Sequence, residues 1–181
     1  MMPTEKYVRE KFTEGMAFEV WVERKLHELE DVKVVKRVDV SEEPHSYLDI
    51  KDVEPEPDVN AKLRNGRSVR MWVTHKKIDQ KLWEIKRKDY IKEMFWRYKT
   101  YKYMRIGDYL LYGVFDKNAN IINGDNPIEV LILKYSNDLI RGKWNDSANV
   151  NQDDLRAKID MSSSKKLYCD SNLLINLFED I

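Results

Sequence analysis

The chain has 181 residues, of which 42% are hydrophobic and 35% are charged, so it can bury one core and we expect a single domain spanning residues 1–181. Its formal net charge of zero excludes a uniformly basic nucleic-acid-binding protein, and its single cysteine excludes an internal disulfide. We find no signal peptide and no apolar run near the ~18 residues of a membrane span, so we expect a soluble, cytoplasmic protein with no membrane partner.

The N-terminal part predicts two helices and a strand. A short helix follows Thr4, and a longer amphipathic helix begins after Gly15. The apolar stripe of the longer helix consists of Phe18, Trp21, Val22, Leu26 and Leu29. Glu19 lies beside this stripe, where a glutamate is either a solvated helix residue or a functional one. Residues 32–40 are rich in valine and predict a strand, whereas the prolines of residues 41–57 favour an acidic loop.

Residues 58–77 predict a β-hairpin around an Asn-Gly turn. A two-residue loop would pair Asp58 with Val73, and a three-residue loop pairs Asp58 with Thr74. Only the second register separates an apolar face from a polar one, so we adopt it. Its apolar face consists of Val59, Ala61, Leu63, Val69, Met71 and Val73. Asp58, Thr74 and Lys76 then lie together on the polar face.

After the hairpin the hydrophobic pattern returns to helical spacing. Residues 78–104 predict a helix that is rich in basic and aromatic residues. Two strongly apolar segments, residues 109–115 and 128–135, predict buried strands. Residues 153–161 and 172–180 predict two short helices. Strands bracketed by helices in this order indicate an α/β fold with a single mixed sheet flanked by helices.

Charge is distributed unevenly along the chain. Residues 39–58 contain eight acids and one lysine, and residues 76–105 contain eleven bases and four acids. An acidic block followed by a basic, aromatic-rich segment suits a bound cation and a phosphate backbone. The alternative is a solvated surface with two oppositely charged faces, and for the aromatic residues it is core packing.

Three short motifs add to this pattern. They are the Gly15-Met16-Ala17-Phe18-Glu19 segment, the Pro57-Asp58 pair and the Thr74-His75-Lys76 strand end. Together with the order helix–strand–strand–strand–helix–strand, they resemble the PD-(D/E)xK nuclease superfamily. The resemblance covers about residues 14–115. It implies a restriction-endonuclease-like α-β-β-β-α-β core there, and we expect residues 116–181 to form a helical C-terminal extension.

The resemblance also implies a function. It predicts a metal-dependent DNA endonuclease in which Asp58, Glu19 and Thr74 hold Mg²⁺ or Mn²⁺ and Lys76 assists the attacking water. Such chemistry needs an oxygen-liganded cation to stabilise charge and activate water. The implied partner is nucleic acid, with DNA expected, and a homodimer is left open.

The chain departs from the superfamily at one position, because Thr74 stands where an aspartate or glutamate is usual. One possibility is that the missing carboxylate has moved to the following helix, with Glu84 and Asp89 as candidates. A second alignment takes Glu84-Ile85-Lys86 as the acid-x-Lys motif itself. The alternative function is a catalytically inactive module of the same fold that binds nucleic acid or a protein. His75 falls on the apolar face of the hairpin, which indicates a structural role.

Overall fold

The structure is a computed structural model that describes residues 5–28, 32–37, 57–97, 103–136, 156–163 and 165–167. The elements of these ranges, in chain order, are α1 (Glu5–His27), β1 (Val32–Arg37), β2 (Val59–Leu63), β3 (Ser68–Ile78), α3 (Gln80–Tyr90), β4 (Met94–Arg97), β5 (Tyr109–Asp116), β6 (Glu129–Lys134), β7 (Arg156–Ile159) and β8 (Lys165–Leu167). The predicted loop over residues 41–57 and the predicted helix over residues 172–180 lie almost wholly outside the described residues.

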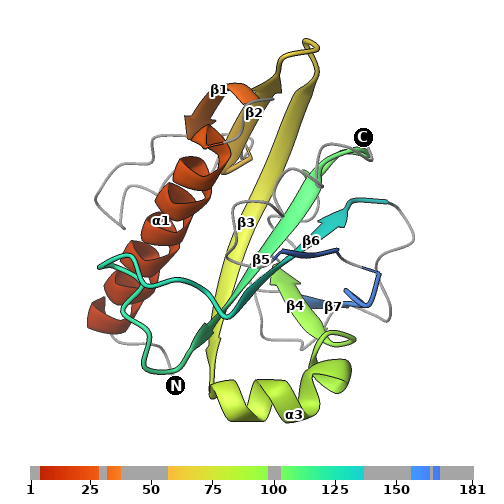
Figure 1. The fold of residues 1–181 in the computed structure, drawn as a ribbon. Coiled ribbons are helices and arrows are strands. Elements are labelled where there is room, and N and C mark those ends of the chain that lie inside the picture. The colour runs from red at the N-terminus through yellow and green to blue at the C-terminus, as the bar shows by residue number, and fades with distance from the viewer. Residues whose placement is uncertain are drawn as a thin grey trace.

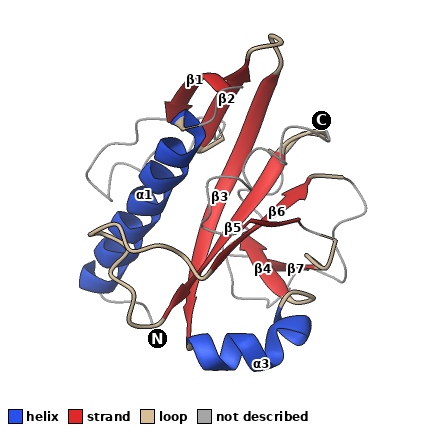
Figure 2. Ribbon diagram, in the orientation of Figure 1, coloured by secondary structure: helices blue, strands red, loops and turns tan. Residues whose placement is uncertain are grey.

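The strands form one large mixed sheet and one small sheet (Figures 1 and 2). The large sheet has the order β1-β2-β3-β5-β6-β8, and its only parallel pair among the described strands is β3 with β5. The small sheet pairs β4 with β7. The predicted α/β class with a mixed sheet is therefore confirmed, whereas the prediction of a single sheet was wrong because β4 and β7 form a second one.

The large sheet is covered on both faces. On one face α1 packs through Phe18, Val22 and Leu26 against the odd-numbered residues of β2 and β3. On the other face α3 and the β4–β7 sheet enclose a second apolar cluster that includes Trp72, Trp83 and Trp96. Residues 109–115 of β5 are all buried, as the continuous apolar run predicted for a strand covered on both faces.

Helix α1 is continuous from Glu5 to His27, so the predicted break near Gly15 was wrong. Gly15 instead lies close to β3, where an added Cβ would be 3.9 Å from Cε1 of His75. A tighter approach occurs at Gly113 of β5, where an added Cβ would lie 2.5 Å from Cζ of Phe18. Because Gly113 has no side chain, the Phe18 ring packs directly on β5. This contact sets the distance between α1 and the sheet.

The helix predicted over residues 78–104 was wrong in its second half. Asp79 caps α3 by accepting a 3.1 Å hydrogen bond from the Leu82 N–H, and the helix ends at Tyr90. The chain then forms β4, in which Met94 and Trp96 are buried and Phe95 is exposed. This alternation of buried and exposed residues has the period of two that is typical of a strand, and β4 pairs with β7. The helix predicted over residues 153–161 was wrong for the same reason, because β7 occupies Arg156–Ile159.

The hairpin register was also wrong. Val59 pairs with Met71 and Lys62 with Ser68, which is a shift of two residues from the register that pairs Asp58 with Thr74. The loop begins one residue earlier than predicted, because the Leu63 N–H bonds to the Arg67 carbonyl and the turn is closed by Gly66, with φ of 86°, and the Asn65 side chain. A two-residue shift leaves every side chain on its predicted face. Val59, Ala61, Leu63, Val69 and Met71 are therefore buried together as expected.

Candidate functional site

The clearest polar site lies where β2 begins. Asp58 directly precedes β2, and its Oδ2 accepts a 2.8 Å hydrogen bond from the N–H of Val73 on β3. A carboxylate oxygen thus takes the place of the main-chain acceptor that a longer β2 would have supplied. Glu19 of α1 forms a side-chain hydrogen bond with the same carboxyl group. The structure therefore brings together two of the predicted site residues, Asp58 and Glu19.

The two carboxyl groups influence each other's protonation. Burial raises the pKa of Asp58 to about 6, against the smaller lowering effects of the hydrogen bonds from Val73 and with Glu19. A hydrogen bond between two carboxyl groups requires a proton on one of them. The pair therefore holds a proton up to nearly neutral pH, in a position where a cation can replace it.

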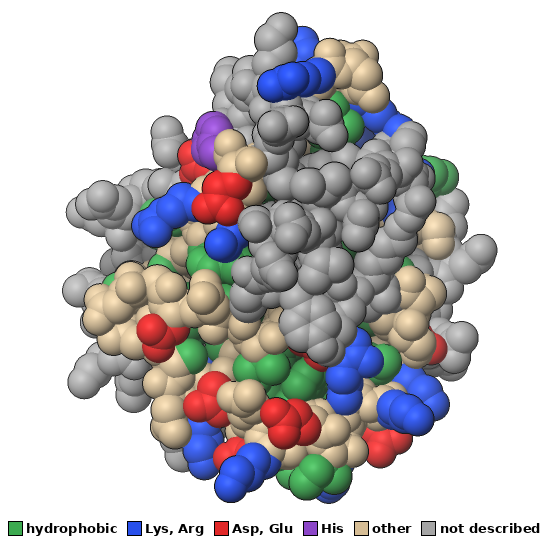
Figure 3. Space-filling model, viewed as in Figure 1, with side chains coloured by type: hydrophobic (Ala, Val, Ile, Leu, Met, Phe, Trp, Pro, Cys, Tyr) green, Lys and Arg blue, Asp and Glu red, His purple; other side chains and the backbone are tan. Residues whose placement is uncertain are grey.

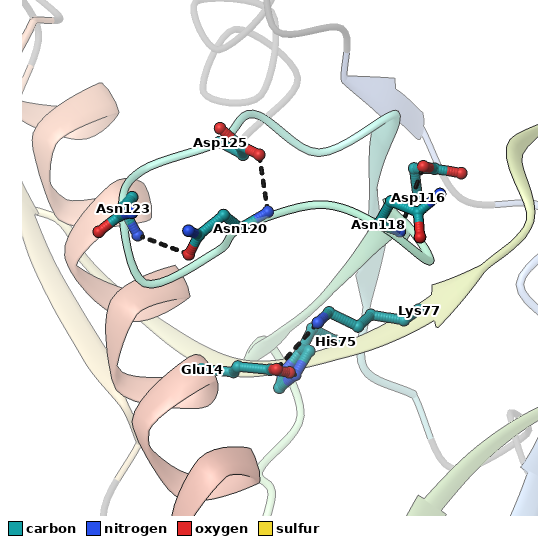
Figure 4. Close-up of polar contacts among 8 residues, drawn as sticks. All are labelled: Glu14, His75, Lys77, Asp116, Asn118, Asn120, Asn123 and Asp125. Atoms are coloured by element: carbon teal, nitrogen blue, oxygen red, sulfur yellow. Dashed lines mark hydrogen bonds and ion pairs between the residues drawn. The ribbon is translucent and has the colours of Figure 1, made fainter.

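A second polar cluster lies further along the same face of β3 (Figure 4). Glu14 of α1 points toward β3, with one carboxylate oxygen 2.9 Å from Nζ of Lys77 and the other 3.4 Å from Nε2 of His75. The side chains of Glu14 and His75 are only 12% and 11% exposed. The rings of Phe18 and Phe115 meet the His75 ring edge-on, which fixes its plane.

The two clusters follow one another along α1 and β3. His75 is two residues beyond Val73, so it lies on the same face about 7 Å further along the strand. Glu14 lies five residues before Glu19 on α1, which runs antiparallel to β3 at this point. The facing side chains of helix and strand thus form a carboxylate pair followed by an imidazole, an ammonium group and a third carboxylate.

Thr74 and Lys76 lie on the opposite face of the sheet. Trp72, two residues before Thr74, belongs to the apolar cluster beneath α3. Nζ of Lys76 lies 5.1 Å from the centroid of the Tyr90 ring at the end of α3, and burial lowers the pKa of Lys76. The expected grouping of Asp58, Thr74 and Lys76 on one polar face was therefore wrong. The chain bends at Asp58, so its carboxylate turns toward α1 rather than continuing the alternation of β2.

The two alternative carboxylates lie on α3. Glu84 is exposed and accepts a 3.3 Å hydrogen bond from Gln80 one turn earlier, and Asp89 is also exposed. Figure 1 shows α3 at the end of β3 away from the hairpin turn. The second alignment, on Glu84-Ile85-Lys86, places an acid-x-Lys motif on an exposed helix instead of a strand. Among the described residues, neither carboxylate contacts Asp58.

Two further carboxylates are buried but have structural roles. Oδ2 of Asp108 accepts hydrogen bonds from Trp72 Nε1 at 2.8 Å and from the Arg105 N–H, and its other oxygen pairs with Arg70. Glu129 accepts hydrogen bonds from Arg87 and from Trp83 Nε1. Both groups are saturated by protein donors, as buried charges require.

Glu14 and Lys77 were not among the predicted site residues, and His75 was predicted to have only a structural role. A signal for all three was present. His75 and Lys77 alternate with Val73, so the predicted hairpin already placed them on the face that α1 covers. Polar and titratable groups on a face covered by a helix need partners, and Glu14 supplies one to each.

Comparison of the chain with protein-family models, with curated proteins and with solved structures finds no match. Neither helix of the described ranges has the length and apolar character needed to cross a membrane. Across those ranges, no three histidine, cysteine, aspartate or glutamate side chains come together as a ready-made metal-binding group.

Proposed function

We propose that the protein is a metal-dependent phosphodiester hydrolase of the PD-(D/E)xK type that acts on DNA. The observation that carries the proposal is the Asp58–Glu19 carboxyl pair at the start of β2. The arrangement of α1, β1, β2, β3, α3 and β5 supports the restriction-endonuclease-like core, since it follows the expected helix–strand–strand–strand–helix–strand order with β4 inserted before the last strand.

The donor set fits Mg²⁺ or Mn²⁺. Magnesium is typically held by one or two carboxylates and keeps several waters or substrate phosphate oxygens as its other ligands. Asp58 and Glu19 supply two such carboxylates, and their shared proton marks a position where positive charge is favourable. A cation held there supplies charge stabilisation and an activated water.

The neighbouring residues of α1 and β3 have roles that follow from their contacts. Glu14 orients His75 through its 3.4 Å contact with Nε2, so His75 is positioned to exchange a proton with water or a leaving oxygen. Lys77 brings a second positive charge to the same face, paired with Glu14 at 2.9 Å. In this proposal Thr74 and Lys76 take no part in the reaction, because they face α3.

Cleavage assays with matched variants test the proposal. Plasmid and linear duplex DNA are incubated with Mg²⁺, with Mn²⁺ or with EDTA, using wild type, Asp58→Asn, Glu19→Gln and the exposed control Asp89→Asn. We expect metal-dependent cleavage by wild type and Asp89→Asn, and loss of cleavage in the two variants of the carboxyl pair. Cleavage that persists in both pair variants would overturn the site.

A second candidate function rests on a different observation. The residue on β3 that contacts Asp58 is Val73, and its side chain offers no metal ligand. This favours an inactive module of the same fold that binds nucleic acid or a protein partner. Wild-type protein that binds DNA but leaves duplex, single-stranded and branched DNA intact with both metals would support this module over the hydrolase.

A further inference from the structure

The tip of the β2–β3 hairpin is a basic projection. β5 first pairs with β3 at Met71, so among the described strands β2 alone flanks β3 from Ser68 to Arg70. Figure 1 shows the turn as the end of the molecule farthest from α3, and Figure 3 shows basic side chains at that end. Lys62, Arg64 and Arg67 are all exposed there.

The charge of this hairpin is of one sign. Between Asp58 and Asp79 the chain contains six lysines and arginines and no aspartate or glutamate. Three of the six are used internally, since Arg70 pairs with Asp108, Lys77 pairs with Glu14 and Lys76 contacts Tyr90. Within the described part of the chain, Lys62 and Arg64 make no ion pair. Among the described residues these two like charges have no carboxylate counterion, and such a pair favours an external anion.

Protection of a sheet edge does not account for these charges. Lysine on an edge strand commonly blocks unwanted pairing. Lys62, however, belongs to an interior strand, where its backbone partners are Val34 of β1 and Ser68 of β3. The basic residues therefore serve no edge that needs covering.

The turn is rigid and its backbone is open. The Leu63 N–H donates to the Arg67 carbonyl at 2.8 Å, and the Asn65 side chain accepts from the Arg67 N–H at 3.0 Å. A Cβ added at Gly66 would meet nothing within 4 Å. A hydrogen-bonded turn with open space at Gly66 lets a bulky polyanion approach at little ordering cost.

We propose that the tip, with Lys62, Arg64 and Arg67, is a phosphate-backbone contact for duplex DNA. This inference rests on the proposed function, because it names how that site meets its substrate. Residues 62–68 contain no aromatic side chain on which unstacked bases could rest, which favours a duplex over a single strand. Arg64 is five residues from Val59, or about 17 Å along the hairpin, so the tip contacts the duplex about five base pairs from the carboxyl pair.

Helix α3 is the rival basic surface. It carries Lys81, Lys86 and Lys88, but Glu84 and Asp89 lie among them and Leu82 and Ile85 are exposed between them. Arg87 is already paired with Glu129. The three exposed lysines of α3 therefore provide a control with the same number of removed charges.

Binding to a fluorescent 20-base-pair duplex is measured in EDTA by anisotropy over a range of salt concentrations. The tip variant is Lys62→Gln/Arg64→Gln/Arg67→Gln, and Lys62→Gln/Arg64→Gln spares Arg67 in case the triple variant unfolds. The control is Lys81→Gln/Lys86→Gln/Lys88→Gln. We expect the tip triple variant to bind about tenfold or more weakly and to lower the salt dependence by roughly 3 units of slope, with little change in the control.

The inference would be overturned if the control triple variant weakened DNA binding as much as the tip triple variant or more. It would also be overturned if wild type bound single-stranded DNA more tightly than the duplex, or bound no DNA. Because binding is measured without metal, the result of the binding assay does not depend on whether the protein cleaves DNA. If wild type cleaves DNA and a folded tip variant still binds DNA normally, the proposed role of the tip is refuted and the proposed hydrolase is retained. If DNA binding depends on the tip but wild type cleaves no DNA, the proposed hydrolase is refuted and the proposed role of the tip is retained.

Discussion

The Val73 N–H donates a 2.8 Å hydrogen bond to Oδ2 of Asp58, so a side chain ends the hydrogen-bond ladder between β2 and β3. The same carboxyl group contacts Glu19 of α1. One residue thereby joins the hairpin to the helix above it. This arrangement has measurable consequences for stability.

Asp58 should make the protein less stable as the pH rises. Its pKa is raised from 3.8 to about 6, so the folded state retains a proton that the unfolded chain releases. The free energy of unfolding should therefore fall between about pH 4 and pH 6, by up to about 3 kcal/mol from this group. Asp58→Asn cannot titrate. Urea denaturation at several pH values measures the unfolding free energies of wild type and Asp58→Asn. As the pH rises through this window, the value for the variant should increase relative to that for wild type. A constant difference would contradict the raised pKa.

The structure predicts which face of β3 carries the chemistry. If the proposed hydrolase is active, His75→Gln should reduce the cleavage rate by about 100-fold or more, because it removes the group positioned for proton exchange. Lys76→Met should leave the rate within about threefold of wild type, because Lys76 lies over Tyr90 beneath α3. Single-turnover cleavage rates measure both. Loss of activity in Lys76→Met with normal activity in His75→Gln would return the assignment to the Thr74-His75-Lys76 motif.

The contact between Phe18 and Gly113 should be sensitive to a single methyl group. Gly113→Ala places a Cβ 2.5 Å from the Phe18 ring and should destabilise the fold by about 1–3 kcal/mol. Phe18→Leu frees that space, so the double variant should be more stable than the sum of the single effects predicts. Gly66→Ala is the control. It suffers only from its positive φ of 86° and should combine additively with Phe18→Leu. If the effects of Gly113→Ala and Phe18→Leu on stability were additive, the close contact between Phe18 and Gly113 would be contradicted.

Asp108 should be the most costly carboxylate to remove. Asp108→Ala leaves the Trp72 N–H without an acceptor and Arg70 without its counterion. The expected loss is about 3–5 kcal/mol, as for other broken buried pairs. The exposed control Asp89→Ala should change stability by less than about 0.5 kcal/mol. Chemical denaturation measures both, and similar values for the two variants would contradict the structural role of Asp108.

Residue alternation predicted the faces of the hairpin correctly but not its register. The pattern of Val59, Ala61 and Leu63 fixes only whether a residue faces α1 or α3, and a shift of two residues preserves that pattern. The register depends on the turn, where the Asn65 side chain and Gly66 close a loop that begins one residue earlier than predicted. Such a local side-chain contact leaves no periodic signal.

The candidate site could be predicted only in part for a related reason. Glu19 and Asp58 were expected in one site, and the structure brings their carboxyl groups together. Thr74 and Lys76 were expected beside them because β2 was assumed to run straight through Asp58. The bend at Asp58 turns its carboxylate to the other face. A sequence motif gives the spacing of residues along a strand, whereas the face of the sheet that carries the chemistry depends on such bends.

The unequal support of β3 along its length has a mechanical consequence. From Met71 to Ile78 the strand is clamped to β5, and this part includes Val73, His75 and Lys77. From Ser68 to Arg70, β2 is its only partner among the described strands. A force applied at the turn is therefore expected to bend this outer part of the strand before it strains the part paired with β5. Amide exchange should accordingly be faster at Val69 than at Val73, and a bend at the turn should leave the geometry of the Asp58–Glu19 pair unchanged.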